Sequence, residues 1–261
     1  NGYSEFDTQS QITEVKFYID RRKYTASTQN DLIELSERED LPEGYVIVAD
    51  GQCEGKGQGT NKWETQDGKN LTFSFLLKPN FLTVDRQFDL MQALSLAVVD
   101  FVRMYVDDEV FVKWPNDIYI GKEKLCGCLI YNKIVGNSLD CVYCGIGLNV
   151  NQTDFVYAPN PTSLCLQTGC KYDLKKLLNQ LLVCLFQRYE QLKSRKIDVI
   201  KADYLDCLLY RDVFAEYIYK GKEICAKAVD VNAYGYLVLE KENGEKIEAE
   251  LKELVLTHRK M

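Results

Sequence analysis

One short stretch of this chain combines lysine, asparagine and aspartate in a way that suits an anionic substrate. It reads Lys113-Trp114-Pro115-Asn116-Asp117, and a second lysine, Lys124, follows it across a short turn. Proline fixes its own φ and has no N–H to donate, so Pro115 predicts a bend between two strands. Surface lysines are usually solvated, which is the simplest explanation for Lys124 taken alone. Two cations and one carboxylate at a single bend nevertheless favour binding of a negatively charged molecule.

A glycine-rich segment is the second candidate. It reads Gly51-Gln52-Cys53-Glu54-Gly55-Lys56-Gly57-Gln58-Gly59-Thr60-Asn61-Lys62-Trp63. Because glycine has no Cβ, the backbone N–H groups of such a loop can approach an anion closely. The segment lacks the spacing of a P-loop, and no long helical pattern follows it as in a dinucleotide-binding fingerprint. Glycines alone also fit a flexible surface turn, but the lysines, Gln52 and Trp63 favour a binding role.

The third candidate is an apolar strand that carries two glycines. It reads Cys144-Gly145-Ile146-Gly147-Leu148-Asn149-Val150-Asn151. Glycines inside a strand indicate that another group approaches the backbone closely, although a β-bulge explains them equally well. Asn149 offers an amide to the edge of a base or to metal-bound water.

The apolar pattern predicts the elements that must position these segments. Apolar residues at helical spacing predict a core helix at 88–105, and the pair Ser27-Thr28 offers an N-cap for an earlier one. Two further helices are predicted at 174–193 and 198–210. Strands are predicted at residues 14–19, 45–49, 71–77, 110–113, 117–120, 124–131 and 138–150, with a long connection at 151–170.

The pattern changes after the last of these helices. Residues 214–257 read as short strands separated by turns, among them Asn243-Gly244, which is a strong hairpin signal. The predicted fold class is therefore α+β, with a mixed or antiparallel sheet, flanking helices and a small C-terminal β-barrel. We expect a catalytic domain at 1–210 and a small β-domain at 211–261.

The composition narrows the class of protein. Of the 261 residues, 46% are hydrophobic and 27% are charged, which is enough for a sizeable core under a charged surface. The net charge of −7 argues against a nucleic-acid partner, which needs a basic face. No apolar run has the length of a membrane span, and the N-terminus lacks the layout of a signal peptide. We therefore expect a cytoplasmic protein that binds neither nucleic acid nor membrane.

Ten cysteines raise the question of a metal or redox site. Cys141 and Cys144 have CxxC spacing, and Cys126 and Cys128 lie close by in the sequence. A zinc site needs two well-spaced pairs or added histidines, and His258 is the only histidine in the chain. Most of these cysteines lie in apolar runs, where a free thiol behaves as a small hydrophobe. We expect reduced structural thiols and assign no metal ligands.

In their order along the chain, the three candidate segments resemble the biotin protein ligases. That family has a glycine- and arginine-rich loop ending in Lys-Trp, then Lys-Trp-Pro-Asn-Asp, then Lys-Leu-x-Gly, then Gly-x-Gly-x-Asn. The resemblance covers nearly the whole chain, and it is most specific at residues 113–117 and 124–127. It implies a catalytic domain like those of class II synthetases and an SH3-like β-barrel. It also implies a biotin carboxyl-carrier protein ligase, which uses ATP and Mg²⁺ to convert biotin to biotinyl-5′-adenylate and transfers biotin to a carrier lysine.

The resemblance also implies roles for single residues. Those expected at the biotin site are Ser27, Thr28, Gln52, Lys56 and Gly127. Those expected at the nucleotide are Trp63, Asn116 and Asn149, and those expected to act in the chemistry are Lys124, Asp117 and Lys113. Lys124 is expected between the biotin carboxylate and the α-phosphate, and Asp117 is expected to orient or deprotonate the acceptor lysine.

The chain departs from the family pattern in the glycine-rich loop. Lys56 and Gln58 stand where the family has arginines. Lysine keeps the charge but loses the planar fork of the guanidinium, and glutamine loses the charge. We therefore expect this protein to release its adenylate more readily than other members.

Other functions stay open at this point. Fewer than fifteen residues precede the first predicted strand, so we expect the monofunctional type without an N-terminal DNA-binding domain. A lipoate or octanoate ligase or transferase of the same fold is one alternative, although its Arg-Arg-x-Ser-Gly-Gly-Gly loop and histidine are missing. A non-catalytic biotin-binding homologue is another. The sequence also leaves a homodimer open, since an exposed sheet edge can pair with a second copy.

Overall fold

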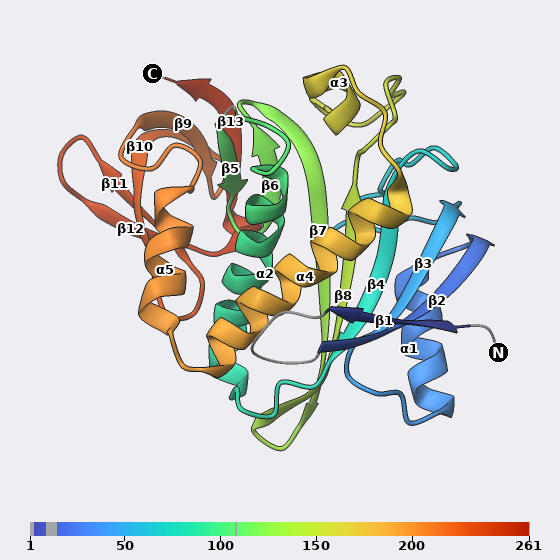
Figure 1. The fold of residues 1–261 in the computed structure, drawn as a ribbon. Coiled ribbons are helices and arrows are strands. Elements are labelled where there is room, and N and C mark those ends of the chain that lie inside the picture. Colours follow the sequence, from blue (N-terminus) through green and yellow to red (C-terminus); the bar gives the residue numbers. More distant parts are fainter. Residues whose placement is uncertain (1–2, 9–14, 108, 261) are drawn as a thin grey trace.

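Two sheets organise the chain in the computed structural model, which describes residues 3–8, 15–107 and 109–260 (Figure 1). The first sheet has eight strands in the order β1-β2-β3-β4-β8-β7-β6-β5. Strands β2 and β3 pair in parallel, and the other neighbours pair antiparallel. Its strands are β1 (Tyr3–Thr8), β2 (Val15–Thr25), β3 (Tyr45–Gln52), β4 (Leu71–Leu77), β5 (Val110–Lys113), β6 (Asp117–Ile120), β7 (Glu123–Val135) and β8 (Ser138–Leu148).

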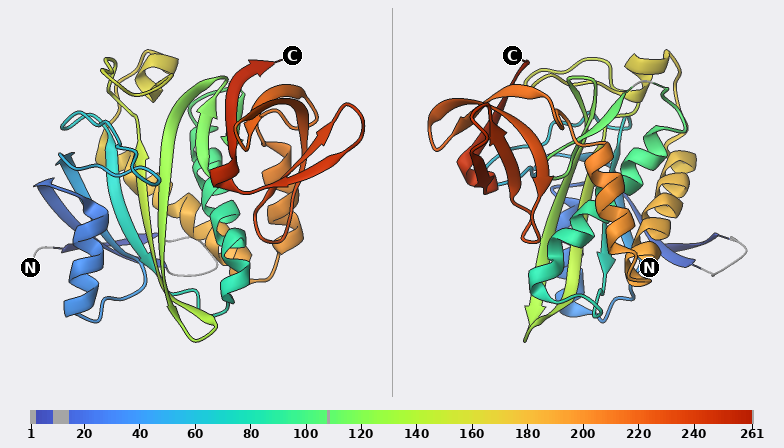
Figure 2. Two further views of the ribbon diagram at one scale, coloured as in Figure 1. Left: turned by 180° about the vertical axis from the view of Figure 1, so that it is seen from behind. Right: turned by 90° about the vertical axis from the view of Figure 1, so that its left-hand side faces the viewer.

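Helices cover both faces of this sheet. The helices are α1 (Thr28–Arg38), α2 (Gln87–Val102), α3 (Leu164–Thr168), α4 (Leu174–Lys193) and α5 (Ile197–Asp206), and a 3-10 turn, η1 (Val84–Arg86), precedes α2. Helices α2, α4 and α5 lie together on one face, and α1 lies on the other (Figures 1 and 2). The main core forms under α2 and α4, while Leu32 of α1 packs with Ile47, Leu76 and Tyr143 in a second cluster.

Strand β4 shows how the sheet separates core from site. Its seven residues alternate between the two faces, as strand geometry requires. Phe73 and Phe75 enter the main core, whereas Thr72 and Ser74 face the opposite side and line a cavity. The site therefore lies on the sheet face that α1 covers only in part.

The second sheet is antiparallel, with the strand order β12-β11-β10-β9-β13. Its strands are β9 (Phe214–Tyr219), β10 (Lys222–Val231), β11 (Leu237–Lys241), β12 (Lys246–Ala249) and β13 (Leu254–Lys260), with a 3-10 turn, η2 (Leu251–Glu253), before β13. It meets the first sheet at the turn before β11. There the Gly235 carbonyl accepts a hydrogen bond from Trp114 Nε1 (2.8 Å), and a Cβ on Gly235 would lie 2.5 Å from the Phe88 ring. The two sheets are thus joined at the bend that contains Pro115.

The α+β class and the C-terminal antiparallel sheet are confirmed, and most predicted elements lie within a few residues of the observed ones. Helix α1 begins as predicted, with Ser27 Oγ accepting the N–H of Asn30 (3.2 Å). Residue 14, predicted to start a strand, lies outside the described residues. The division between residues 210 and 211 remains a prediction.

Two of the predicted elements need correction. The connection at 151–170 contains the short helix α3, which Ser163 caps and which ends at Gly169 in the left-handed conformation. The helix predicted at 198–210 ends at Asp206, because the chain then turns to pair with β5.

All ten cysteines lie within the described residues, and none forms a disulfide there. Burial raises the pKa of the Cys126 and Cys144 thiols well above the ordinary value. A raised pKa keeps a thiol protonated and unreactive. No helix in the part of the chain that the structure describes combines the length and apolar character that a membrane span needs.

Candidate active site

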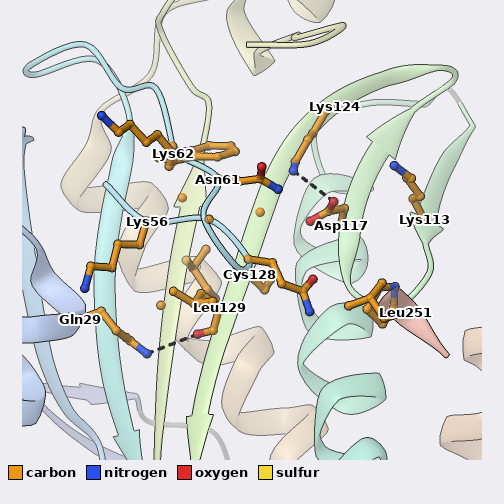
Figure 3. Close-up of a pocket in the computed structure, with 18 of the residues that line it drawn as sticks. Gln29, Lys56, Asn61, Lys62, Lys113, Asp117, Lys124, Cys128, Leu129 and Leu251 are labelled. Atoms are coloured by element: carbon orange, nitrogen blue, oxygen red, sulfur yellow. Dashed lines mark hydrogen bonds and ion pairs between the residues drawn. The ribbon is translucent and has the colours of Figure 1, made fainter. Parts of the chain in front are cut away.

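A cavity of about 280 Å³ lies between the glycine-rich loop, the cavity face of β4, β7 and β8, and the second sheet (Figure 3). The residues predicted for a site that line it are Ser27, Thr28, Gln52, Lys56, Trp63, Lys113, Asp117, Lys124 and Gly127. Asn116 and Asn149 are buried next to it and do not line it. Segments separated by up to a hundred residues therefore converge on one hollow.

One end of the cavity is built from buried hydroxyl and amide groups. Thr28 Oγ1 and Ser74 Oγ share a hydrogen bond of 2.9 Å, and the Thr28 N–H donates to Gln52 Oε1 at 2.9 Å. Gln29 Nε2 donates to the Tyr143 carbonyl (2.9 Å), while Gln29 Oε1 has no hydrogen-bond partner among the described residues. Groups fixed in this way suit a small, neutral, polar ring system.

Sequence reasoning missed several residues that line the cavity. Gln29 directly follows the Ser27-Thr28 pair, so its neighbours were a usable signal. Thr72 and Ser74 were detectable as the polar positions that alternate with apolar ones in 71–77. The apolar wall contributed by the second sheet had no local signal, and it consists of Tyr217, Leu237, Leu251, Leu254 and Leu256.

The other end of the cavity holds the charged groups. Lys124 Nζ and Asp117 Oδ2 form an ion pair of 3.1 Å, and their side chains are only 24% and 26% exposed (Figure 3). Lys113 lies opposite Asp117 in the β5–β6 pairing, with its Nζ 5.6 Å from the centre of the Tyr119 ring. Burial lowers the pKa of Lys113, and the nearby Lys124 lowers it further, while Asp117 opposes the shift. Excess positive charge is thus held in a shielded place, as an anionic ligand requires.

The bend at Pro115 is fixed from three sides. Tyr204 of α5 donates its hydroxyl hydrogen to the Pro115 carbonyl (2.7 Å), and Trp114 is bonded to the second sheet as described above. Asn116 Nδ2 donates to the Cys128 carbonyl on β7 (3.2 Å). In this structure Asn116 braces the bend, and its predicted nucleotide contact stays a prediction.

Trp63 packs closely against two glycines of adjacent strands. Gly127 of β7 and Gly147 of β8 are directly paired, and the pairing is regular at this point. A Cβ on Gly147 would lie 2.4 Å from Trp63 Nε1, and one on Gly127 would lie 3.2 Å from the same indole. The β-bulge explanation for Gly147 is therefore wrong, because the glycines make room for the indole ring. Lys124 Nζ lies 5.6 Å from the ring centre, so Trp63 also borders the charged end.

The glycine-rich loop is a closed hairpin in this structure. The Gly57 N–H donates to the Asn61 carbonyl (2.8 Å), and the Trp63 N–H donates to the Gly55 carbonyl (2.9 Å). Lys56 Nζ donates a hydrogen bond to Asn30 Oδ1 on α1 (3.1 Å) at the surface. The loop thus covers the polar end through its own hydrogen bonds, without arginines.

Asn149 directly follows β8 and lies beside the cavity. Its backbone N–H donates to the Leu125 carbonyl (3.0 Å), and its Nδ2 donates to the Thr162 carbonyl (3.0 Å). Its Oδ1 is buried without a hydrogen-bond partner among the described residues. Such an acceptor is costly to leave unsatisfied, which favours a ligand donor at this place.

Three residues are relevant to the alternative of a transferase that would use a cysteine or histidine. Cys126 is fully buried, and its raised pKa disfavours the thiolate that a nucleophile needs. The side chain of His258 lies outside what the structure describes. Cys128 lines the cavity, but it has no described base other than the Lys124–Asp117 pair nearby.

Comparison with known proteins gives consistent results. Residues 22–149 match the biotin/lipoate A/B protein ligase family. The bifunctional ligase/repressor BirA of Bacillus spizizenii is 28% identical over 225 residues, which is 85% of this chain and 69% of that protein. The Bacillus subtilis BirA is 30% identical over 180 residues, or 67% of this chain and 55% of that protein. The structure of the Aquifex aeolicus biotin protein ligase with biotin and ATP superimposes with a TM-score of 0.75 at 27% identity, covering 93% of this chain and 99% of that one.

Proposed function

Because residues 22–149 place this chain in the biotin/lipoate A/B protein ligase family, we propose that it activates biotin with ATP and transfers it to a lysine of a biotin carboxyl carrier protein. The observation that carries the proposal is the Lys124–Asp117 pair at one end of a cavity whose other end is buried and polar. The polar end suits the ureido ring of biotin, and the charged end suits a carboxylate meeting a phosphate.

In the first step, an oxygen of the biotin carboxylate attacks the α-phosphorus of ATP. The bond from that phosphorus to the pyrophosphate oxygen breaks, giving biotinyl-5′-adenylate and pyrophosphate. Both reactants are anions, so the main task of the protein is to align them and offset their charge. Lys124 bridges the two anions, and Lys113 adds positive charge from the neighbouring strand.

The chain can accommodate Mg²⁺ with the help of ATP. Asp117 is the only carboxylate among the described residues that line the cavity, and no group of three or more potential ligands occurs in the described chain. Mg²⁺ usually keeps several waters and takes one or two carboxylates plus phosphate oxygens, so one carboxylate fits. When bound, the ion would offset phosphate charge.

The adenine is assigned to the Trp63 side of the cavity. Asn149 Oδ1, which is buried without a described partner beside the cavity, would accept a hydrogen bond from the adenine amino group. Trp63 offers an aromatic face over the paired glycines 127 and 147. The glycine-rich hairpin covers the adenylate and limits its hydrolysis by water.

In the second step, the amine of the acceptor lysine attacks the biotinyl carbonyl carbon. The bond from this carbon to the phosphate oxygen breaks, AMP leaves, and the nitrogen must lose a proton. Asp117 accepts that proton, since its carboxylate is the only one among the described residues that line the cavity. The acceptor domain, a cytoplasmic location and a homodimer are further parts of the proposal, and the acceptor domain is the one that rests on the family resemblance.

The decisive experiment is biotin-dependent exchange of labelled pyrophosphate into ATP. We expect exchange that requires biotin, ignores lipoate and falls at least about 100-fold in Lys124→Ala, the loss typical of a single electrostatic contact to the transition state. Lys122→Ala, which removes an exposed cation from the adjacent turn, is the matched control and should exchange normally.

Other outcomes point to the alternatives. Exchange that depends on lipoate or octanoate would assign the chain to the other branch of its family. Biotin binding without any exchange would indicate a non-catalytic homologue and reject the ligase proposal.

A further inference from the structure

Glu64, which directly follows Trp63, has an unusual set of partners. Its carboxylate accepts hydrogen bonds from three consecutive backbone N–H groups, those of Val156 (2.7 Å), Tyr157 (2.8 Å) and Ala158 (2.8 Å). Successive N–H groups that converge on one point form an anion-binding concavity, or nest. The chain therefore fills its own anion site with a glutamate from a distant loop.

The loop that carries this nest is otherwise weakly anchored at its tip. The side chains of Val156 and Tyr157 are 91% and 62% exposed, so they bury little against the protein. The backbone bonds to Glu64 hold this part of the loop. Farther back, Gln152 Oε1 accepts the N–H of Gln66 (3.1 Å), which joins the same two segments a second time.

The other end of the same loop runs beside the charged end of the cavity. The Lys124 N–H donates to the Asn160 carbonyl (2.7 Å), and the Thr162 N–H donates to the Lys124 carbonyl (2.9 Å). The Thr162 carbonyl also accepts from Asn149 Nδ2 (3.0 Å). One loop thus connects Lys124 and Asn149 to Glu64, and Trp63 is the residue directly before Glu64.

We propose that Glu64 is a positioning residue for the nucleotide, fixing Trp63 over the paired glycines 127 and 147 by bonding to the nest at 156–158. It touches neither ATP nor the adenylate. Its contribution is to order the hairpin before ATP arrives, so that the entropy lost in ordering the hairpin does not weaken ATP binding. The inference rests on the proposed function, because it names a determinant of that site's nucleotide affinity.

The charge state of Glu64 supports this role. Burial alone would raise the pKa of its carboxyl, but the three backbone donors outweigh burial and lower the pKa overall. The Glu64 carboxylate is therefore ionised at neutral pH, and charge-assisted hydrogen bonds of this kind are stronger than neutral ones. Since the folded pKa is lowered, the contribution of Glu64 to stability is present above the ordinary glutamate pKa and is lost as pH falls through the folded pKa.

The test compares Glu64→Gln with the matched control Glu54→Gln, which removes an exposed carboxylate from the same loop. An amide keeps the size of the side chain but turns one acceptor into a donor that faces the nest. We expect the KM for ATP and the rate of adenylate dissociation each to rise about tenfold, the equivalent of one charge-assisted hydrogen bond. The Kd for biotin and all parameters of the control should stay within about twofold.

A shorter side chain provides a second, milder variant. Glu64→Asp keeps the charge but loses one methylene of reach, and we expect it to fall between wild type and Glu64→Gln. If Glu64→Gln lowers Tm but leaves the KM for ATP and adenylate release unchanged, the residue merely fastens two loops and the inference is wrong. If wild type itself shows no biotin-dependent exchange, the proposed function is wrong, and so is the inference that rests on it.

Discussion

The two walls of the cavity are held in place in different ways. The strand wall, made of Lys113, Asp117 and Lys124, lies on paired strands, and a buried bond from Tyr204 fixes its bend. The loop wall, residues 55–63, is held by hydrogen bonds within its own hairpin and by the neighbouring Glu64. The first wall depends on the core of the protein, whereas the second depends on a few surface bonds.

This difference suits the two tasks of the site. Groups that align two anions must be held within a narrow geometry, which buried sheet and helix contacts provide. A cover that admits ATP and releases the product must open at low cost, so it is drawn from the least stable part of the structure. The comparison therefore predicts that changes in the strand wall affect chemistry and that changes in the loop wall affect nucleotide handling.

After Lys124→Ala, the largest effect is expected from Lys113→Met, also in the strand wall. Removing this charge should lower the rate of adenylation about 100-fold, as for other preorganised charges. The same change should raise the free energy of unfolding by about 1 kcal/mol, since a site built for function often costs stability. The two measurements are pyrophosphate exchange and urea unfolding, with the exposed Lys122→Met as the control.

The pH dependence of that stability gain has a definite sign. Burial lowers the pKa of Lys113 in the folded protein, so between that pKa and the ordinary lysine value the unfolded state binds more protons. Wild-type stability therefore rises with pH through this window, and the advantage of methionine shrinks there. A methionine variant that unfolds more easily than wild type at neutral pH would contradict the conclusion that burying the Lys113 charge costs stability.

A smaller effect is expected from Gly147→Ala, which moves the loop wall and leaves the charged residues in place. The new Cβ would lie 2.4 Å from Trp63 Nε1, so the indole must shift. We expect the KM for ATP to rise about tenfold, with biotin affinity within about twofold. In a Trp63→Ala background the substitution should have little further effect, because residues in contact are not additive. Full additivity would show that the indole is not the cause.

The smallest effect is expected from Gln58→Arg, which returns a charge to the loop wall. Gln58 lines the cavity, and an arginine there can bond to phosphate oxygens with two donors. We expect adenylate dissociation, followed by a chase with unlabelled ligand, to slow about threefold to tenfold at low salt. Thr60→Arg adds the same charge at an exposed position of the loop and should change it less. An unaltered dissociation rate in Gln58→Arg would contradict the expectation that the missing arginines make adenylate release faster.

The sequence by itself determined the strand wall. The bend at Pro115, the two flanking strands and the lysine beyond the turn all lie within the fifteen residues 110–124, and local pairing in a meander of antiparallel strands brings them together. Alternation likewise fixed β4, and helical spacing fixed α2, because both patterns report burial on one face. The order of the motifs was enough to indicate the family.

Only the tertiary structure decided how the loop wall is built. The contact of Trp63 with Gly147 and the bonds of Glu64 to residues 156–158 join segments more than eighty residues apart. Packing also turned Asn116 into a brace under β7 and brought the apolar side chains of the second sheet into the cavity. None of these has a period or a turn signal, since they arise from how finished elements meet, and a local pattern carries no information about its distant neighbour.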